Sequence, residues 1–274
     1  MTDLRPIQPL PIADLTPQPA EAMGARPVIE WVRPEELYVE AKYQREIGAR
    51  SMRLIRSMVE GWSWSKFKLP ACSLLEDGRR VVIDGQHTAI GAACHPLIDQ
   101  IPVLVTRTGS IGERAEAFVG HNRNRIAITA LQIHRAGVAA GDELANAVED
   151  ACRLAGVTVL QVTRPRGEWR PGETIAIQAI TSAVSHKGRS GGARILKILV
   201  RARQMPITAL LVKATFQILY QPEWAWKDDS ALADIIASKT ADQWEQHAAE
   251  RRAVGQPTQR ALAVEWYRLL QGRR

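Results

Sequence analysis

The stretch VVIDGQHTAIGAA, residues 81–93, decides the fold of the first part of the chain. Its β-branched start predicts a buried strand that stops at Asp84-Gly85, and the small residues after it predict a helix that begins near Gln86 or His87. A strand-to-helix turn of this kind exposes backbone N–H groups at the start of the helix, where anions bind favourably. Gly85 would let a ligand approach the backbone closely, so this turn is the first candidate site.

The neighbouring segments predict further strands. VIEWVRPEELYV (28–39) reads as a short strand followed by a turn or helical turn. KLPACSLLEDGRRVVID (68–84) reads as two strands joined at Asp77-Gly78, because Asp-Gly between β-rich runs is a strong hairpin signal. IPVLVTR (101–107) predicts one more short, apolar strand.

Helices are expected between these strands. YQREIGARSMRLIRSMVEGW (43–62) has apolar residues near helical spacing and predicts an amphipathic helix with Gly61 just past its end. Ser110 is a helix cap with Glu113 three residues on, and the helix it starts is expected to end at Gly120. HNRNR (121–125) then lies at a helix terminus or in a loop.

The order of these features resembles the N-terminal domain of ParB-type partition proteins, in the ParB/sulfiredoxin superfamily. Those proteins have a strand leading into a Gly-Glu-Arg-Arg helix start, an Ile-Pro strand, and a Glu-Asn-x-x-Arg box followed by a helix. The chain is still more similar to bacterial and phage relatives with a Tyr-Gln-Arg segment and an Asp-Gly-Gln-His-Arg motif, here YQRE (43–46) and DGQHT (84–88). The resemblance covers residues 29–140 and implies a small α/β domain.

The resemblance also implies a nucleotide pocket, for CTP or ATP with Mg²⁺. In ParB proteins the Gly-Glu-Arg-Arg turn and the Asn-x-x-Arg box hold the triphosphate of CTP. The sequence departs from this pattern at Thr88 and Ile90, where ParB proteins carry arginine, and at His121, where the second box has glutamate. The implied phosphate-binding residues are Asp84, Gly85, Gln86, His87, Thr88, Asn122, Arg123 and Arg125, and the implied pocket rim is Tyr43, Gln44 and Arg45.

These residues also have structural interpretations that the sequence leaves open. Asp84 before a glycine can form a turn or cap a helix instead of binding a metal or a nucleotide hydroxyl. His87 can cap its own helix, and Asn122 can occupy a left-handed position in a polar loop. Arg125 is the favoured phosphate contact, because a guanidinium matches the geometry of phosphate oxygens.

Composition limits the class of protein. The 274 residues are 46% apolar, enough for a packed core, and neither a signal peptide nor a membrane-spanning run is evident. Cys72, Cys94 and Cys152 are odd in number and widely spaced, which favours reduced thiols over disulfides, and no zinc or other metal site is predicted. The expected location is the cytoplasm, where the protein could associate with the nucleoid. No membrane partner is expected.

Positive charge is concentrated in one segment. Residues 161–213 carry 10 basic and 2 acidic side chains, whereas residues 1–160 carry 18 and 19 and residues 214–274 carry 8 and 8. Such a cluster is typical of a polyanion partner, although a solvated helical face is the alternative. A helix, a polar turn at SHKGRSGG (185–192) and a second helix could form a helix-turn-helix, with a helical bundle as the favoured alternative. The candidate DNA-binding residues are Lys187, Arg189, Arg194, Lys197, Arg201 and Arg203.

The predicted fold class is α+β, with three regions along the chain. Residues 1–28 form a flexible, proline-rich arm, residues 29–140 the ParB-like α/β domain, and residues 141–274 an all-helical domain that contains the basic segment. Four tryptophans of the last region fit anchors between helices better than a base-stacking surface, namely Trp224, Trp226, Trp244 and Trp266.

The favoured function is that of a nucleic-acid-associated binding or regulatory protein in a plasmid, phage or DNA-modification context, with an altered nucleotide pocket. DNA is the expected partner, and a homodimer is among the assemblies that the sequence allows. One alternative is a metal-dependent nuclease or nucleotide hydrolase that uses Asp84, His87 and Arg125, so enzyme activity stays open. Another alternative is an oligomeric module that binds an acidic protein.

Overall fold

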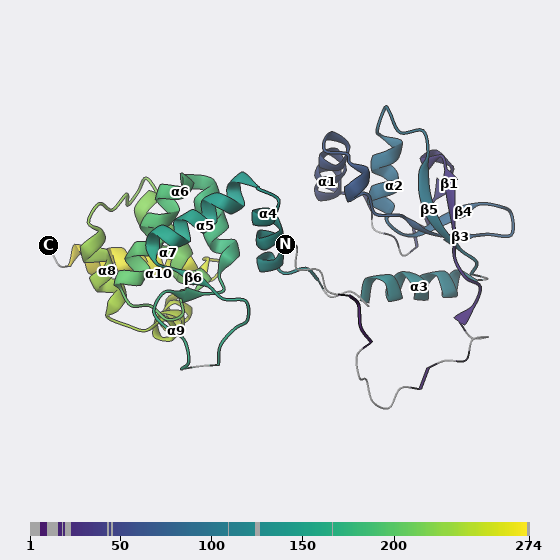
Figure 1. Ribbon diagram of the computed structural model, residues 1–274. Helices are drawn as coiled ribbons and strands as arrows, with labels where there is room; N and C mark the ends of the chain where they lie inside the picture. The colour runs from purple at the N-terminus through teal and green to yellow at the C-terminus, as the bar shows by residue number, and fades with distance from the viewer. Residues whose placement is uncertain are drawn as a thin grey trace. The chain divides into compact units, whose positions relative to one another are not determined.

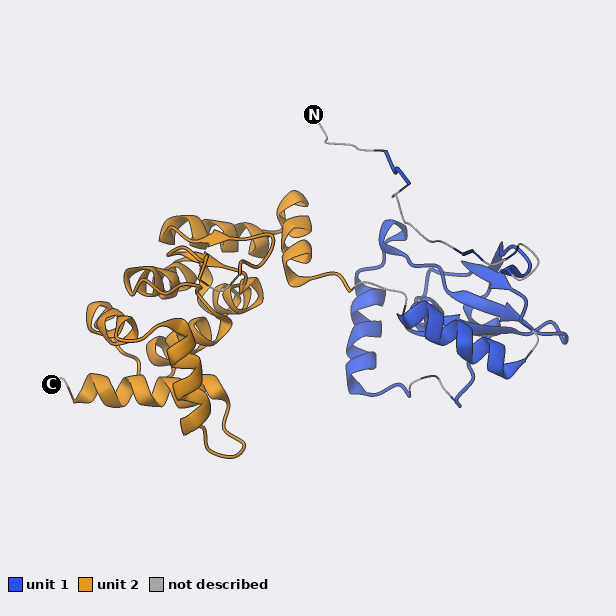
Figure 2. Cartoon of the chain, turned by 90° about the horizontal axis from the view of Figure 1, so that it is seen from below, with its two compact units in different colours: residues 1–126 blue, residues 127–274 orange. Residues whose placement is uncertain are grey.

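The computed structural model describes residues 6–9, 16–17, 19, 23–42, 44, 46–108, 110–123, 127–165 and 167–272. The chain divides into two compact units, residues 1–126 and 127–274, which are coloured separately in Figure 2. Most of the arm predicted over residues 1–28 lies outside the described residues, as do Tyr43, Arg45 and Arg125. Within the described part, no helix is long and apolar enough to cross a membrane.

A mixed five-stranded sheet forms the centre of the first unit (Figure 1). β3 is antiparallel to β4 and parallel to β5, while β1 is antiparallel to β5 and β2 is parallel to β4. The hairpin predicted at Asp77-Gly78 and the strand predicted over 101–107 are confirmed. The strands are β1 (Val28–Val32), β2 (Leu37–Tyr38), β3 (Ala71–Leu74), β4 (Arg80–Asp84) and β5 (Ile101–Thr106), and their order in the sheet is β1-β5-β3-β4-β2.

Two helices cover the apolar face of this sheet. Alternate residues of β5, Ile101, Val103 and Val105, are buried, and α2 (Gln86–Ala93) packs Ala89 and Ala92 into the same core. Helix α1 (Ala49–Glu60) packs in turn against α2 and ends at Gly61 as predicted. Small residues on α2 thus let a second helical layer approach the sheet.

Helix α3 (Ile111–Arg123) packs against β4. Its predicted cap is confirmed, because the Glu113 N–H donates to Ser110 Oγ at 3.2 Å. The predicted end at Gly120 is wrong: the helix continues for three more residues. A glycine within a helix costs only about 1 kcal/mol relative to alanine, too little to end a helix by itself.

The second unit is built mainly from helices (Figure 1). Trp244 and Trp266 are fully buried with ring centroids 5.6 Å apart, and Trp226 is also buried, so the predicted anchoring role is confirmed for these three. Trp224 is half-buried against Tyr267. The helices are α4 (Ala130–Ala139), α5 (Glu143–Ala155), α6 (Ile177–Arg201), α7 (Ala209–Tyr220), α8 (Asp229–Ala237), α9 (Ala241–Arg251) and α10 (Thr258–Gln271).

The all-helical prediction for this region missed a pair of two-residue parallel strands, β6 (Thr158–Val159) and β7 (Glu173–Thr174). The Thr158 N–H donates to Gly172 O and the Leu160 N–H to Thr174 O, which ties the two ends of a long connection together. Strands this short leave almost no periodic signal in a sequence.

The predicted domain boundary at residues 140 and 141 differs from the structure, which places it between residues 126 and 127. Helix α4 therefore belongs to the second unit, where Leu131 packs against its core and His134 Nε2 lies 2.7 Å from Glu149 Oε1 of α5. Asp142 caps α5, since its Oδ1 accepts the Ala145 N–H. The hydrogen bond of His134 with Glu149, one of the contacts of α4 with the second unit, joins residues 15 positions apart, which no local pattern reports.

Candidate functional site

The predicted strand-to-helix turn is present. β4 ends at Asp84, Gly85 is the N-cap of α2 with φ 94°, and the helix starts at Gln86. No side chain of the N-cap accepts a hydrogen bond at this helix start. The first N–H groups of an α-helix have no partner within the helix, so the turn offers backbone donors to an acceptor.

Asp84 acts as a turn former. Its Oδ1 accepts the Gly85 N–H at 2.9 Å, and its Oδ2 lies 2.5 Å from Lys68 Nζ. The aspartate thus places a carboxylate at the start of the helix, where negative charge is favoured, and Lys68 balances that charge. A metal ion at this carboxylate would have to compete with Lys68, and an anionic ligand would have to compete with the carboxylate for Lys68 and the Gly85 N–H.

The reason for a glycine at position 85 differs from the predicted one. A Cβ at Gly85 would lie 2.9 Å from Pro70 Cα, and the backbone there is left-handed. Packing against Pro70 and the positive φ therefore require glycine at this turn without any ligand. The predicted close approach of a ligand to this backbone is replaced by the close approach of Pro70.

Gln44, the described member of the predicted pocket rim, reaches the same end of the sheet. Its Nε2 donates to Val82 O at 3.0 Å and to Ile83 O at 3.2 Å. Strand β2 pairs with β4 only at Arg80 and Val81. The Gln44 amide donates to the two carbonyls of β4 that follow this pairing. Gln44 thus lies beside the end of β4, and its place at the rim of a pocket stays a prediction.

Arg114, which the sequence did not single out, joins α3 to this region. Its guanidinium Nη2 donates to Glu40 Oε1 at 2.6 Å, and its Nε lies 3.1 Å from Glu40 Oε2. Arg114 is buried, and the backbone O of Glu40 accepts the Gln44 N–H at 3.2 Å. One ion pair therefore fixes α3, the loop after β2 and the end of β4 together. Nothing local marks this arginine, because its partner is 74 residues away.

The first turn of α2 contains three of the predicted ligand residues, in different environments. Thr88 is buried with 6% of its surface exposed, so its side chain belongs to the core and is not available to phosphate. Gln86 and His87 are half-buried. His87 Nε2 is shielded from solvent and has no hydrogen-bond partner in the described part of the chain. A buried polar atom without a partner is uncommon in proteins, so His87 is the residue of this turn whose environment leaves a polar atom to be satisfied.

The second predicted box is less well placed for phosphate. Asn122 and Arg123 form the last turn of α3 and are exposed, and Asn122 Nδ2 donates to Phe118 O at 2.8 Å within the helix. The left-handed position considered for Asn122 is wrong, because the residue is helical. Among the described residues, neither Asn122 nor Arg123 forms a hydrogen bond or ion pair with the turn, and Arg125, the favoured phosphate contact, lies outside them.

The segment considered for a helix-turn-helix forms one interrupted helix, packed in a helical bundle as the favoured alternative expected. SHKGRSGG stays within α6, and only Gly188 departs from helical geometry, with φ 66° and ψ 178°. The two halves approach closely there, since a Cβ on Gly192 would lie 2.4 Å from Val184 Cγ2. A break at one residue is shorter than the three or four residues of a DNA-binding helix-turn-helix.

Several of the predicted DNA-binding residues bind other parts of the second unit. Arg194 holds the Asp229 carboxylate at the start of α8, with Nη2 2.6 Å from Oδ1, and this bond raises the pKa of Arg194. Arg201 donates to Ser230 Oγ at 2.6 Å, and Arg189 Nη1 lies 3.3 Å from Asp150 Oδ2. Because α8 packs against α6, the start of α8 occupies part of the stripe assigned to DNA.

The remaining predicted cations stay open to solvent. Lys187, Lys197 and Arg203 are exposed, and within the described residues none of them has a carboxylate partner. Lys187 Nζ lies 5.2 Å from the centroid of the Tyr220 ring, which holds it at the surface of the second unit. Arg189 and Arg201 are exposed as well, so these three cations differ from them in forming no hydrogen bond or ion pair within the described residues.

Two further features bear on chemistry. The described residues contain no group of three His, Cys, Asp or Glu side chains placed to hold a metal ion. All three cysteines are free, and burial raises the pKa of the Cys72 and Cys152 thiols to about 12. A thiol with so high a pKa is a poor nucleophile near neutral pH, since the thiolate is the reactive form.

No family model and no curated protein matches the sequence. The comparison with solved structures does give matches. One match is the C-terminally truncated chromosome-partitioning protein ParB from Caulobacter crescentus, complexed with CTP-gamma-S. It is 13% identical over 87% of this chain and 98% of that chain, with a TM-score of 0.35. Another is a Pnob8-like ParB-N domain, 13% identical over 90% of this chain and 97% of that chain, with a TM-score of 0.29. Both matches are ParB proteins.

Proposed function

We propose that the protein is a nucleic-acid-associated binding protein whose second unit supplies the phosphate contacts. The observation that carries this proposal is the concentration of 10 basic against 2 acidic side chains in residues 161–213, of which Lys187, Lys197 and Arg203 are exposed without a carboxylate partner in the described part. Phosphate contacts from lysine and arginine supply most of the affinity of non-specific DNA binding. DNA is therefore the favoured partner, without a sequence-reading helix assigned.

The test is duplex binding by the full chain, measured by fluorescence anisotropy at several salt concentrations. On duplex DNA each phosphate contact contributes about −0.9 to the slope of log K against log salt. The triple substitution Lys187→Gln, Lys197→Gln, Arg203→Gln should weaken binding and reduce the slope by about 2 to 3.

A matched control removes the same charge from the first unit. Arg50, Arg53 and Arg56 are exposed on α1, and their replacement by glutamine should leave binding nearly unchanged. Equal losses in the two triple variants would mean that net charge alone drives binding. Loss in the α1 variant alone would move the interface to the first unit, and salt-insensitive binding would exclude a phosphate-based interface.

A second candidate function, nucleotide binding at the turn, is favoured by one observation. His87 Nε2 is shielded and unpartnered beside the uncapped start of α2. An acceptor such as a phosphate oxygen would give this nitrogen a hydrogen bond and meet the free N–H groups of the turn. We propose this as a binding role and not a hydrolytic one, because the Asp84 carboxylate already bonds Lys68 and the Gly85 N–H.

Calorimetric titration of the full chain with CTP, ATP and GTP, each with Mg²⁺, tests this role. His87→Ala should abolish binding of whichever of these three triphosphates the wild type binds, while His186→Ala on α6 should not, since His186 Nδ1 donates to Ser182 O of its own helix. Absence of binding by all three nucleotides would refute the role. Magnesium-dependent strand cleavage that is lost in Asp84→Ala would favour the nuclease alternative instead.

A further inference from the structure

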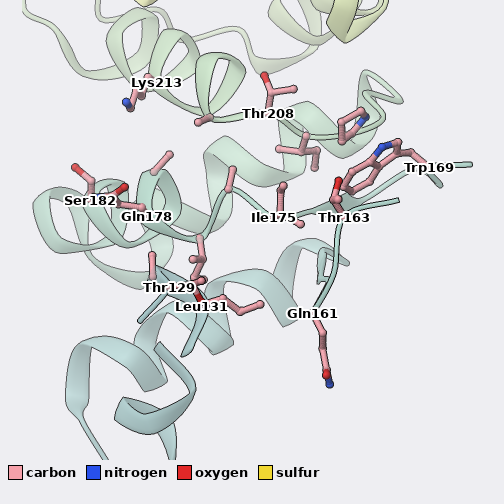
Figure 3. A pocket seen from close by; sticks show the side chains of 17 residues that line it. Thr129, Leu131, Gln161, Thr163, Trp169, Ile175, Gln178, Ser182, Thr208 and Lys213 are labelled. Carbon is pink, nitrogen blue, oxygen red and sulfur yellow. The ribbon is translucent and has the colours of Figure 1, made fainter. Parts of the chain in front are cut away.

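A cavity of about 790 Å³ lies within the second unit (Figure 3). It is bounded by the beginnings of α4, α6 and α7 and by the connection between β6 and β7, which contributes Thr163 and Trp169. Its volume is within the range of about 300–1,000 Å³ typical of sites for small molecules. None of the motifs found in the sequence and none of the proposed DNA contacts lines this cavity. It shares with those contacts only the excess of positive charge in residues 161–213.

Much of the wall is apolar. Leu131, Ile175, Ile177 and Ile207 line it, and the half-buried Trp169 stands on the side of the β6–β7 connection (Figure 3). A tryptophan indole offers a flat apolar face on which a planar ring can stack. The ligand that fits this wall therefore has a planar, largely apolar part.

The charged lining has a single sign. Among the lining residues that the structure describes, none is an aspartate or glutamate, whereas Lys213 is present. Lys213 is exposed, and it has no carboxylate partner within the described ranges. The cavity therefore favours an anion over a neutral or cationic ligand.

Backbone groups add to this preference. The N-cap residues of three helices line the same cavity, Thr129 for α4, Ala176 for α6 and Thr208 for α7. Thr129 and Thr208 cap their helices through their side chains, but Ala176 has no side-chain acceptor for the first N–H groups of α6. The positive ends of three helix dipoles thus face a space that contains one lysine and no carboxylate.

Polar side chains that could orient a ligand stand on one side of the cavity. Gln178 and Ser182 are one turn apart on α6, and Lys213 lies on α7 (Figure 3). Their amide, hydroxyl and ammonium groups form no hydrogen bond to other described residues. Ser182 and Lys213 also line an adjoining cavity of about 220 Å³, so the two residues stand where the two spaces meet. Gln161, in contrast, points its amide away from the other labelled side chains (Figure 3).

We propose that this cavity binds a phosphorylated small molecule with a planar heterocycle, of the size of a nucleoside monophosphate. The phosphate would lie near Lys213 and the starts of α6 and α7, and the ring would lie against Trp169. A phosphomonoester carries between one and two negative charges near neutral pH, which suits a site with one lysine and several free N–H donors. This site is separate from the turn in the first unit and from Lys187, Lys197 and Arg203.

Calorimetric titration of the full chain with AMP, CMP, GMP and UMP, with the four nucleosides and with inorganic phosphate, tests the proposal. At least one monophosphate should bind in the micromolar range, and its nucleoside at least about tenfold more weakly, because a charge-assisted hydrogen bond is lost. Lys213→Met should cause a similar loss, and Trp169→Ala should weaken the monophosphate without weakening inorganic phosphate.

The matched control is Lys197→Met, which removes an exposed lysine of α6 that does not line the cavity. It should leave monophosphate binding unchanged. His87→Ala should do the same, which separates this site from the proposed nucleotide turn. Hydrogen exchange in residues 175–182 and 207–213 should slow when the ligand is present. Absence of binding by all four monophosphates, or equal losses in Lys213→Met and Lys197→Met, would overturn the proposal.

Discussion

Arg114 on α3 and Glu40 in the loop after β2 form a two-pronged ion pair, although 74 residues separate them in the chain. The Arg114 side chain is 9% exposed and that of Glu40 is 19% exposed. The same loop returns to the sheet four residues later, where Gln44 binds the last carbonyls of β4. The ion pair therefore positions the helix that carries the second predicted ligand box relative to the strand-to-helix turn.

Replacement of Arg114 by methionine should destabilise the first unit by about 3 kcal/mol, because it leaves the Glu40 carboxylate partly buried without its partner. Urea unfolding, followed with hydrogen exchange that resolves α3 and β4, measures the loss in that unit. The exposed pair Arg79 and Asp77, whose side chains are 54% and 49% exposed, is the matched control. Arg79→Met should leave the free energy of unfolding nearly unchanged, because an exposed ion pair is screened by solvent, and similar losses in the two variants would contradict the anchoring role.

The contrast between these two pairs shows which parts of the fold the sequence can predict. The Asp77-Gly78 hairpin, the turn at Asp84-Gly85 and the Asp142 cap are specified by residues close together in the chain, and all three are present. Arg114 and Glu40 are each ordinary surface residue types, and only the tertiary fold buries them together.

The same limit applies to the candidate DNA-binding helix. The spacing of Arg194, Lys197 and Arg201 on α6 correctly places them along one side of a helix. Nothing in that spacing shows that Asp229 of α8 binds Arg194 or that Ser230 of α8 binds Arg201. A row of basic residues on one side of a helix therefore indicates a polar partner. Whether that partner is DNA or another helix of the same chain depends on contacts with residues about 30 positions away.

Gly192 should be intolerant of a side chain. An added Cβ would lie 2.4 Å from Val184 Cγ2 and 3.6 Å from Ala151 Cβ, where the two halves of α6 and helix α5 meet. Gly192→Ala should lower the free energy of unfolding of the second unit by about 1–3 kcal/mol through overpacking. Gly120→Ala on α3 is the control, since nothing lies within 4 Å of its added Cβ and alanine favours a helix. A Gly192→Ala protein more stable than the wild type would show that the contact between the two halves of α6 and α5 can relax to accommodate a methyl group.

The three thiols should differ sharply in alkylation. Cys94 is exposed, whereas Cys72 and Cys152 are buried and burial raises their pKa to about 12. Iodoacetamide at pH 8 should therefore modify one cysteine of the native chain and all three in denaturant, because only an accessible thiolate reacts. Peptide mass spectrometry identifies the site, and the Cys94→Ser variant should remain unmodified while folded. Modification of Cys72 or Cys152 in that variant would show that its core opens on the timescale of the reaction.

Glu265 should make the stability of the second unit depend on pH below about 4.5. It is buried on α10, and the hydrogen bonds from Arg268 hold the pKa of its carboxyl below the ordinary 4.5. A lowered pKa in the folded state means that the unfolded chain takes up the proton first, so the contribution is complete above the unfolded pKa and is lost as the pH falls through the folded pKa. Glu265→Gln should cost about 2 kcal/mol at pH 7 and progressively less in urea unfolding below pH 4.5. The exposed Glu250→Gln is the control, and a cost for Glu265→Gln that stayed constant down to pH 3 would show that packing, and not the ionised carboxylate, supplies the stabilisation.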